Sequence, residues 1–112
     1  MLSTFAGAQV RDAAPLFAAL GDETRLRLVH RLSSEGPGSI AHLSSNARVS
    51  RQAITKHLRV LSDAGLVRGA RRGREVIWDL EPKRLAEAHA YLERISAQWD
   101  AALGRLKALV EE

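Results

Sequence analysis

Cysteine is absent from this chain of 112 residues, so disulfides, thiol sensors and thiolate metal sites cannot form within it. Aromatic rings are scarce as well, with two Phe, two Trp and one Tyr. So few rings argue against a platform that stacks single-stranded bases. The core is therefore expected to consist mostly of Leu, Val, Ile and Ala.

Long apolar runs are also missing, since none approaches the ~20 residues that a membrane-spanning helix needs. The segment Met1 to Asp12 lacks the basic-then-apolar profile of a signal peptide. These features predict a cytoplasmic protein without a membrane partner. The length predicts one domain, residues 1–112.

Residue patterns that support catalysis or bind metal ions are not found. The sequence has no Ser/His/Asp arrangement with supporting glycines, no phosphate-binding loop and no convergent carboxylate pair. Glu87 and His89 are two residues apart, a spacing that turns them away from each other on a helix. We therefore predict no enzyme activity, no metal site and no cofactor. His57 is expected to be a structural histidine bonded to a neighbouring group.

Positive charge is concentrated in one segment, from Ser50 to Arg74. This segment holds seven Lys and Arg residues against one Asp, a net charge of +6, whereas the whole chain carries +4. The remaining residues therefore sum to −2. Charge sorted in this way is typical of a surface that binds a polyanion, and double-stranded DNA is the partner that we expect.

Capping residues and glycines divide the chain into a series of helices with one hairpin. Asp12 is predicted to cap a helix over 12–20, with Pro15 in its first turn, and Asp22 to cap the next. In that second helix Leu26, Val29 and Leu32 recur at helical spacing.

The next part of the chain predicts a helix-turn-helix over 39–64. Ser39 caps a short helix, Asn46 to Val49 form a tight connection, and Ser50 caps a helix that reaches Ala64. Gly65 is expected to end this helix by adopting the left-handed backbone conformation.

A hairpin over 66–80 follows, with its turn at Arg72-Gly73, and Pro82 begins a last helix that continues to about residue 111. The predicted fold is mainly α with a small β-hairpin: a winged helix-turn-helix of five helices and a two-stranded wing.

The fourth predicted helix has two chemically different faces. At about 100° per residue, its cations and hydrogen-bonding side chains share one face. The opposite, apolar face consists of Ala53, Ile54, His57, Leu58, Val60 and Leu61. Arg and Gln can each make paired hydrogen bonds to base edges, whereas Lys and Arg at the rim neutralise phosphates. The predicted DNA-binding residues of this helix are Ser50, Arg51, Gln52, Thr55, Lys56 and Arg59.

The hairpin tip adds a second basic element, formed by Arg71, Arg72 and Arg74 around Gly73. Three like charges at a turn repel one another, which favours a role in contacting phosphates or the minor groove. A solubilising loop is the alternative.

The last predicted helix carries a heptad pattern. Its apolar residues from Leu85 to Leu109 recur in steps of 3, 4, 3, 4, 3, 4 and 3. A helix over 82–111, roughly 43 Å long, is longer than a small domain can cover, which predicts a homodimer in which this helix pairs with its mate or with the mate's first helix, 12–20. An ordinary helix packed on its own domain is the alternative. The predicted interface residues are Leu16, Leu85, Leu92, Ile95, Trp99 and Leu106.

Two segments resemble motifs of the ArsR/SmtB-like bacterial regulators. Leu20 to Val29 (LGDETRLRLV) is similar to the family opening L-x-D-x-T-R-x-x-I-L. Ser50 to Leu61 (SRQAITKHLRVL) resembles the recognition helix, and Arg72 to Arg74 with Trp78 to Leu80 is similar to the wing. The resemblance implies a homodimeric winged-helix repressor that binds an operator palindrome and is released by a signal. It also implies that the first and last helices form the dimer.

The chain departs from the family at its known sensor positions. Ser39 and Ala41 stand where arsenite- and soft-metal-sensing members carry Cys-x-Cys, and the last helix lacks the Asp-x-His and later His pair of other members. The stretch from Tyr91 to Trp99 is similar to a subgroup without metal ligands.

Function is therefore predicted as sequence-specific regulation of transcription by a homodimeric repressor with an unidentified small-molecule effector. Two alternatives remain open: a metal-responsive sensor with a non-cysteine site, and a winged-helix module that docks its basic face on an acidic protein.

Overall fold

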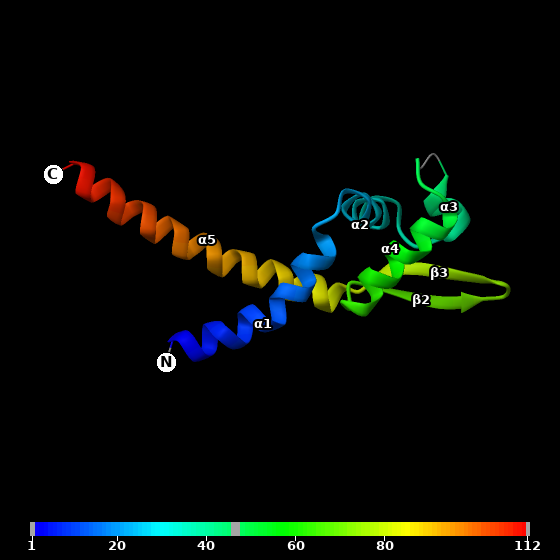
Figure 1. The fold of residues 1–112 in the computed structure, drawn as a ribbon, viewed down its shortest axis with the longest axis horizontal. Helices are drawn as coiled ribbons and strands as arrows, with labels where there is room; N and C mark the ends of the chain where they lie inside the picture. The colour runs from blue at the N-terminus through cyan, green and yellow to red at the C-terminus, as the bar shows by residue number, and fades with distance from the viewer. Residues whose placement is uncertain (1, 46–47, 112) are drawn as a thin grey trace.

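The computed structural model describes residues 2–45 and 48–111, and for residues 2–9 the backbone alone. Its elements are α1 (Leu2–Leu20), α2 (Glu23–Glu35), β1 (Gly38–Ser39), α3 (Ile40–Ser44), α4 (Arg51–Asp63), β2 (Val67–Arg72), β3 (Glu75–Leu80) and α5 (Pro82–Glu111). The arm formed by α1 and α5 occupies one end of the molecule, and α3, α4 and the β2–β3 hairpin occupy the other (Figure 1). The mainly helical winged helix-turn-helix is confirmed.

Three helices begin at the capping residues that the sequence indicates. The side-chain oxygens of Asp22, Ser39 and Ser50 each accept a hydrogen bond from the backbone N–H three residues later, at 3.0, 3.2 and 3.1 Å. Gly65 follows α4 with φ 80°, a conformation that only glycine adopts readily. Residues 46–47 of the predicted connection lie outside the described residues.

The first helix is longer than predicted. It begins at Leu2 rather than at residue 12, so Asp12 lies inside it and caps nothing. Asp12 instead places its Oδ2 3.4 Å from Nη1 of Arg84 on α5. Pro15 is an internal residue of the helix. In the sequence Asp12 resembles a helix cap, because its contact with the distant Arg84 cannot be predicted from neighbouring residues.

The wing is part of a three-stranded sheet of order β1-β3-β2, which corrects the two-stranded prediction. Gly38 of β1 pairs with Trp78, and Arg72 of β2 pairs with Glu75. The turn therefore lies at Gly73-Arg74, one residue beyond the predicted position, and β2 begins at Val67. A two-residue strand such as β1 is too short to show the alternation by which strands are found in a sequence.

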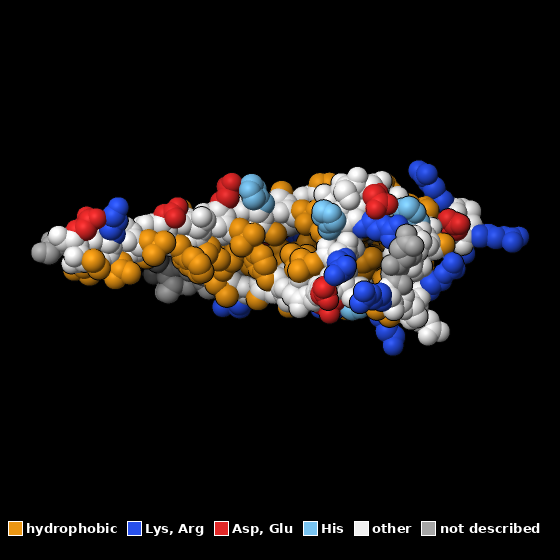
Figure 2. Space-filling model, turned by 90° about the horizontal axis from the view of Figure 1, so that it is seen from above, with side chains coloured by type: hydrophobic (Ala, Val, Ile, Leu, Met, Phe, Trp, Pro, Cys, Tyr) orange, Lys and Arg blue, Asp and Glu red, His pale blue; other side chains and the backbone are white. Residues whose placement is uncertain are grey.

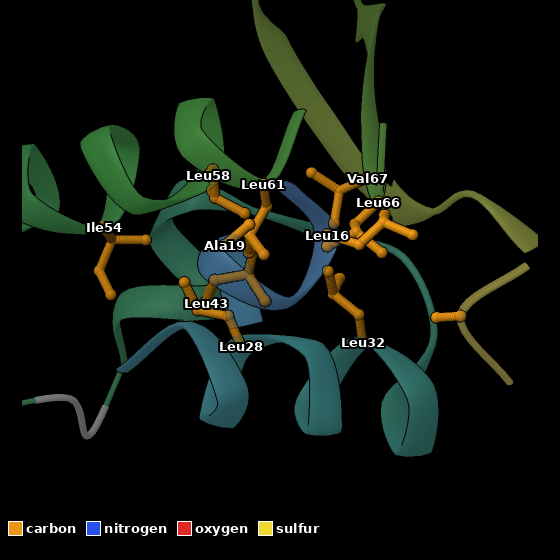
Figure 3. Packing of buried hydrophobic residues seen from close by; sticks show 11 residues of the cluster. Leu16, Ala19, Leu28, Leu32, Leu43, Ile54, Leu58, Leu61, Leu66 and Val67 are labelled. Atoms are coloured by element: carbon orange, nitrogen blue, oxygen red, sulfur yellow. The ribbon is translucent and has the colours of Figure 1, made fainter. Parts of the chain in front are cut away.

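The core consists of aliphatic side chains from the helices and the sheet, as the shortage of aromatic residues indicated. Leu58 and Leu61 of α4 face Leu28 and Leu32 of α2, with α1 between them (Figure 3). The predicted apolar face of α2 was wrong at Leu26, whose exposed fraction is 52%. Leu26 and Leu28 are two residues apart and point in nearly opposite directions, so only one of them can face the core.

Helix α5 packs on the domain only through its first turns. Leu85 is partly buried against the core and Ala88 is buried, whereas Trp99 is 68% exposed. The radius of gyration is 18.2 Å, against ~13 Å for a compact chain of this length. No helix in the described part of the chain combines the length and hydropathy needed to cross a membrane.

Leu16 does not lie on the exposed part of the arm. Its side chain is 1% exposed and belongs to the core cluster of its own domain. The assignment of Leu16 to the dimer interface is therefore corrected: α1 turns this residue inward, because Leu16 and Ala19 occupy the face that packs on α2 and α4.

Candidate nucleic-acid interface

Helix α4 is held on the domain by one face and presents the other to solvent. Ile54, Leu58 and Leu61 are buried, in agreement with the predicted apolar face. Val60, which was assigned to the same face, is 41% exposed. It lies at the margin of the buried stripe, and the core does not extend far enough to cover it.

The opposite face of α4 carries the predicted recognition residues. Arg51, Gln52, Lys56 and Arg59 are exposed, and Ser50 lies at the N-terminal cap. Thr55 is half-buried, and its hydroxyl donates to the carbonyl of Arg51 at 2.9 Å. The Thr55 hydroxyl proton is therefore engaged within the helix, and its methyl group and free lone pair are what remain for a base edge.

The wing tip presents arginines on both faces of the hairpin. Arg71 and Arg72 are consecutive residues of β2, so their side chains leave the sheet on opposite faces. Arg74 lies in the turn beside Gly73, whose φ of 60° permits the tight reversal. The three arginines therefore surround the tip, and a narrow wing of this kind can contact phosphates on either side of a groove.

Most cations of this end of the molecule have no partner among the residues that the structure describes. In residues 48–111 the exposed basic side chains of α4 and the wing tip form no hydrogen bond or ion pair. Arg68 is different, because its Nη1 lies 3.2 Å from Oε2 of Glu81. Figure 2 shows most Lys and Arg side chains at the end that carries α3, α4 and the hairpin, away from the apolar band along α5.

Arg48 is a further exposed cation that the sequence analysis did not select. It precedes the cap of α4 by two residues. Its positive charge is visible in the sequence, but Arg48 precedes α4 and is therefore not part of the face that helical periodicity defines.

A polar cluster beneath α4 fixes its position and includes the predicted structural histidine. Nδ1 of His57 lies 3.2 Å from Nη1 of Arg25 and 3.7 Å from Oδ2 of Asp22. Nε of Arg25 donates to the carbonyl of Ala19 at 2.5 Å. Several contacts lower the pKa of Asp22, and the hydrogen bond from the backbone N–H of Arg25 contributes most. This cluster connects α1, α2 and α4, and His57 has the structural role expected of it.

A second cluster attaches α3 to α2. Nη1 of Arg31 donates to the carbonyls of Leu43 and Ser45, at 3.2 and 3.1 Å. Nε2 of His42 lies 2.9 Å from Oε1 of Glu35. The hydrogen bond with His42, followed by that with Arg31, lowers the pKa of Glu35. The first helix of the helix-turn-helix is thus held by charged side chains as well as by Leu43.

Histidines and carboxylates form separate pairs rather than a metal centre. His42 pairs with Glu35, His57 with Asp22, and His89 with Glu93. Among residues 2–45 and 48–111, no group of three or more His, Asp or Glu side chains is arranged to hold an ion.

The segment that forms this interface matches a family model described as a helix-turn-helix domain, over residues 20–70. The chain is 36% identical over 93 residues to the HTH-type transcriptional regulator Rv2034 of Mycobacterium tuberculosis, covering 83% of each chain. It is 31% identical to the HTH-type transcriptional repressor SmtB of the same species, covering 85% of this chain and 69% of the repressor.

A solved structure agrees with these similarities in fold and in sequence. The ArsR-like transcriptional regulator from Rhodococcus sp. RHA1 superposes with a TM-score of 0.73 and 38% sequence identity. The similarity covers 88% of this chain and 92% of the regulator. Both the helix-turn-helix and most of the flanking arm therefore have a counterpart of known structure.

Proposed function

This chain belongs to the ArsR/SmtB family of DNA-binding transcriptional regulators, and on that premise we propose that it is a homodimeric repressor, without enzyme activity, that binds a palindromic operator and is released by a signal. Each subunit would insert α4 into the major groove and place its wing tip on phosphates or in the minor groove. We infer that it acts in the cytoplasm.

The observation that carries the proposal is the exposed polar face of α4, whose cations have no partner among the residues that the structure describes. Arg51 and Gln52 are exposed in its first turn, where a recognition helix reaches base edges. Lys56 and Arg59 flank them along the same helix. Such a cation can bind a phosphate without first breaking an ion pair within the protein. This surface therefore suits association with DNA.

The exposed apolar band of α5 supports the homodimer. Leu92, Trp99, Leu106 and Leu109 are exposed on the part of the helix that projects from the domain. A contiguous band of this kind is unfavourable in water and is typical of a surface that a partner covers. The band repeats in heptads, which is the pattern by which one helix packs on another. A two-fold axis along this arm would place two α4 helices about one DNA turn apart.

The test is binding to the DNA upstream of the gene for this protein, at two salt concentrations, with random duplex as competitor. We expect a footprint over a palindrome that survives the competitor. Binding that random duplex abolishes equally well would contradict the operator and would favour an acidic protein partner for the basic surface. Metal ions and small molecules are then screened for loss of the footprint, which identifies the effector.

A further inference from the structure

Arg84, near the start of α5, contacts both α1 and the end of α4. Its Nε donates to the carbonyl of Ala64, the residue that caps α4, at 3.2 Å. Its Nη1 lies 3.4 Å from Oδ2 of Asp12, and its Nη2 donates to the Asp12 carbonyl at 3.4 Å. The side chain is 23% exposed, so most of it is enclosed by these elements.

The stem of the same side chain packs against Gly65. A Cβ on Gly65 would lie 3.3 Å from Cγ of Arg84, closer than ordinary van der Waals contact. The left-handed turn after α4 therefore passes directly over the arginine. Glu87 completes the surroundings, with Oε2 2.6 Å from Nη1, and this hydrogen bond is the largest influence that raises the pKa of Arg84.

These contacts place one rigid guanidinium between α4 and the arm formed by α1 and α5. The planar group offers donors in a fixed geometry, so it constrains direction as well as distance. One side of the group holds the C-terminal end of α4, and the other holds the middle of α1. The Arg25 cluster holds the other end of α1 to the middle of α4, through Ala19 and His57.

We propose that Arg84 is a positioning residue that fixes the angle between α4 and the α1–α5 arm, and thereby sets the separation of half-sites that the dimer accepts. The inference rests on the proposed dimeric operator binding. In such a dimer the arm joins the subunits, so rotation of α4 against the arm moves the two recognition helices relative to each other. One base pair of extra spacing rotates a half-site by about 35° and displaces it by about 3.4 Å.

The experiment compares the palindrome found by footprinting with versions that have one base pair inserted or removed at the centre. Dissociation constants are measured for the full-length dimer and for Arg84→Met, which keeps the stem and loses the fork. Arg84→Lys keeps the charge but cannot reach both elements with one planar group. Glu93→Gln is the matched control, because it removes one charge from α5 and Glu93 pairs with His89 rather than with Arg84.

The measured quantity is the ratio of affinities for the natural and altered spacings. We expect the ratio to fall about five- to tenfold in Arg84→Met and in Arg84→Lys, and to be unchanged in Glu93→Gln. Affinity for random duplex should stay the same in all four proteins, because the basic side chains of α4 and of the wing are untouched. Circular dichroism and the oligomeric state of each variant show that the fold and dimer are kept.

A purely structural role for Arg84 would weaken binding to all spacings in proportion and leave the ratio unchanged. That result, in whichever of the two Arg84 variants folds, would overturn the inference while leaving operator binding intact. Failure of the unaltered protein to prefer any palindrome would instead overturn the proposed function, and this inference with it.

Discussion

Nη1 of Arg25 on α2 lies 3.2 Å from Nδ1 of His57 on α4, and this contact joins the charged cluster at the start of α2 to α4. Arg25 is always charged, so it donates and Nδ1 of His57 accepts. His57 is partly buried, so its loss leaves the guanidinium with fewer partners in a confined space.

We expect His57→Ala to lower the free energy of unfolding by about 1–2 kcal/mol, because it removes the acceptor of a charged donor. His57→Gln should lose less, since its amide oxygen can accept. Urea unfolding at fixed protein concentration measures both. His30→Ala is the control, because His30 is exposed on α2. Equal effects at His30 and His57 would show that the Arg25 contact adds nothing.

Leu16→Ala is expected to destabilise the fold by about 2–5 kcal/mol, the usual range for a leucine removed from a core. The matched control is Leu26→Ala, since Leu26 is also helical but is half exposed, and we expect a change below about 0.5 kcal/mol. Thermal or urea unfolding compares the two. A large effect at Leu26 and none at Leu16 would mean that α1 and α2 pack differently in solution.

Trp99→Asp should weaken the dimer by at least ~100-fold, since a large aromatic side chain anchors the exposed band and a carboxylate there is repelled by its copy. Ala97→Asp is the control, because two residues along a helix place Ala97 about 160° from Trp99. Sedimentation equilibrium measures the dissociation constants. If both variants remain equally dimeric, α5 does not form the interface.

Gln52→Ala and Arg72→Ala should affect DNA binding in different ways. Gln52 is exposed in the first turn of α4, so its loss should change sequence preference. Arg72 is exposed at the wing, so its loss should weaken all duplexes alike and reduce the salt slope by about one unit. Titrations with operator and random duplex at several salt concentrations separate the two effects. Equal losses on both duplexes for both variants would contradict this division.

Acid should weaken the attachment of α3 to α2. The hydrogen bond with His42 holds the pKa of Glu35 below its ordinary value of 4.5. Ionised Glu35 therefore contributes stability above that value, and the contribution is lost as the pH falls through the lower pKa of the folded state. We expect Glu35→Gln to be less stable than the unaltered protein at about pH 6, and the difference to close below pH 4.5. A difference that grows in acid would contradict the sign.

Local chemistry in the sequence was sufficient to predict most of the elements and the polar face of α4. Side-chain caps at Asp22, Ser39 and Ser50 act within three residues, so they can be found without knowledge of the fold. The exposed face of α4 follows from helical periodicity, and its predicted recognition residues are exposed except for the half-buried Thr55.

Other features of the structure depend on tertiary packing, which capping and periodicity do not predict. The start of α1, the inward direction of Leu16 and the third strand of the sheet depend on partners far away in the chain. Helical periodicity does not reveal the partners of Arg25 and Arg84, each of which bonds residues from other helices. The sequence determined which polar groups share the exposed face of α4, because residue charge and helical period are local properties. Only the folded chain determined how α4 is oriented on the arm, because hydrogen bonds between distant elements set that orientation.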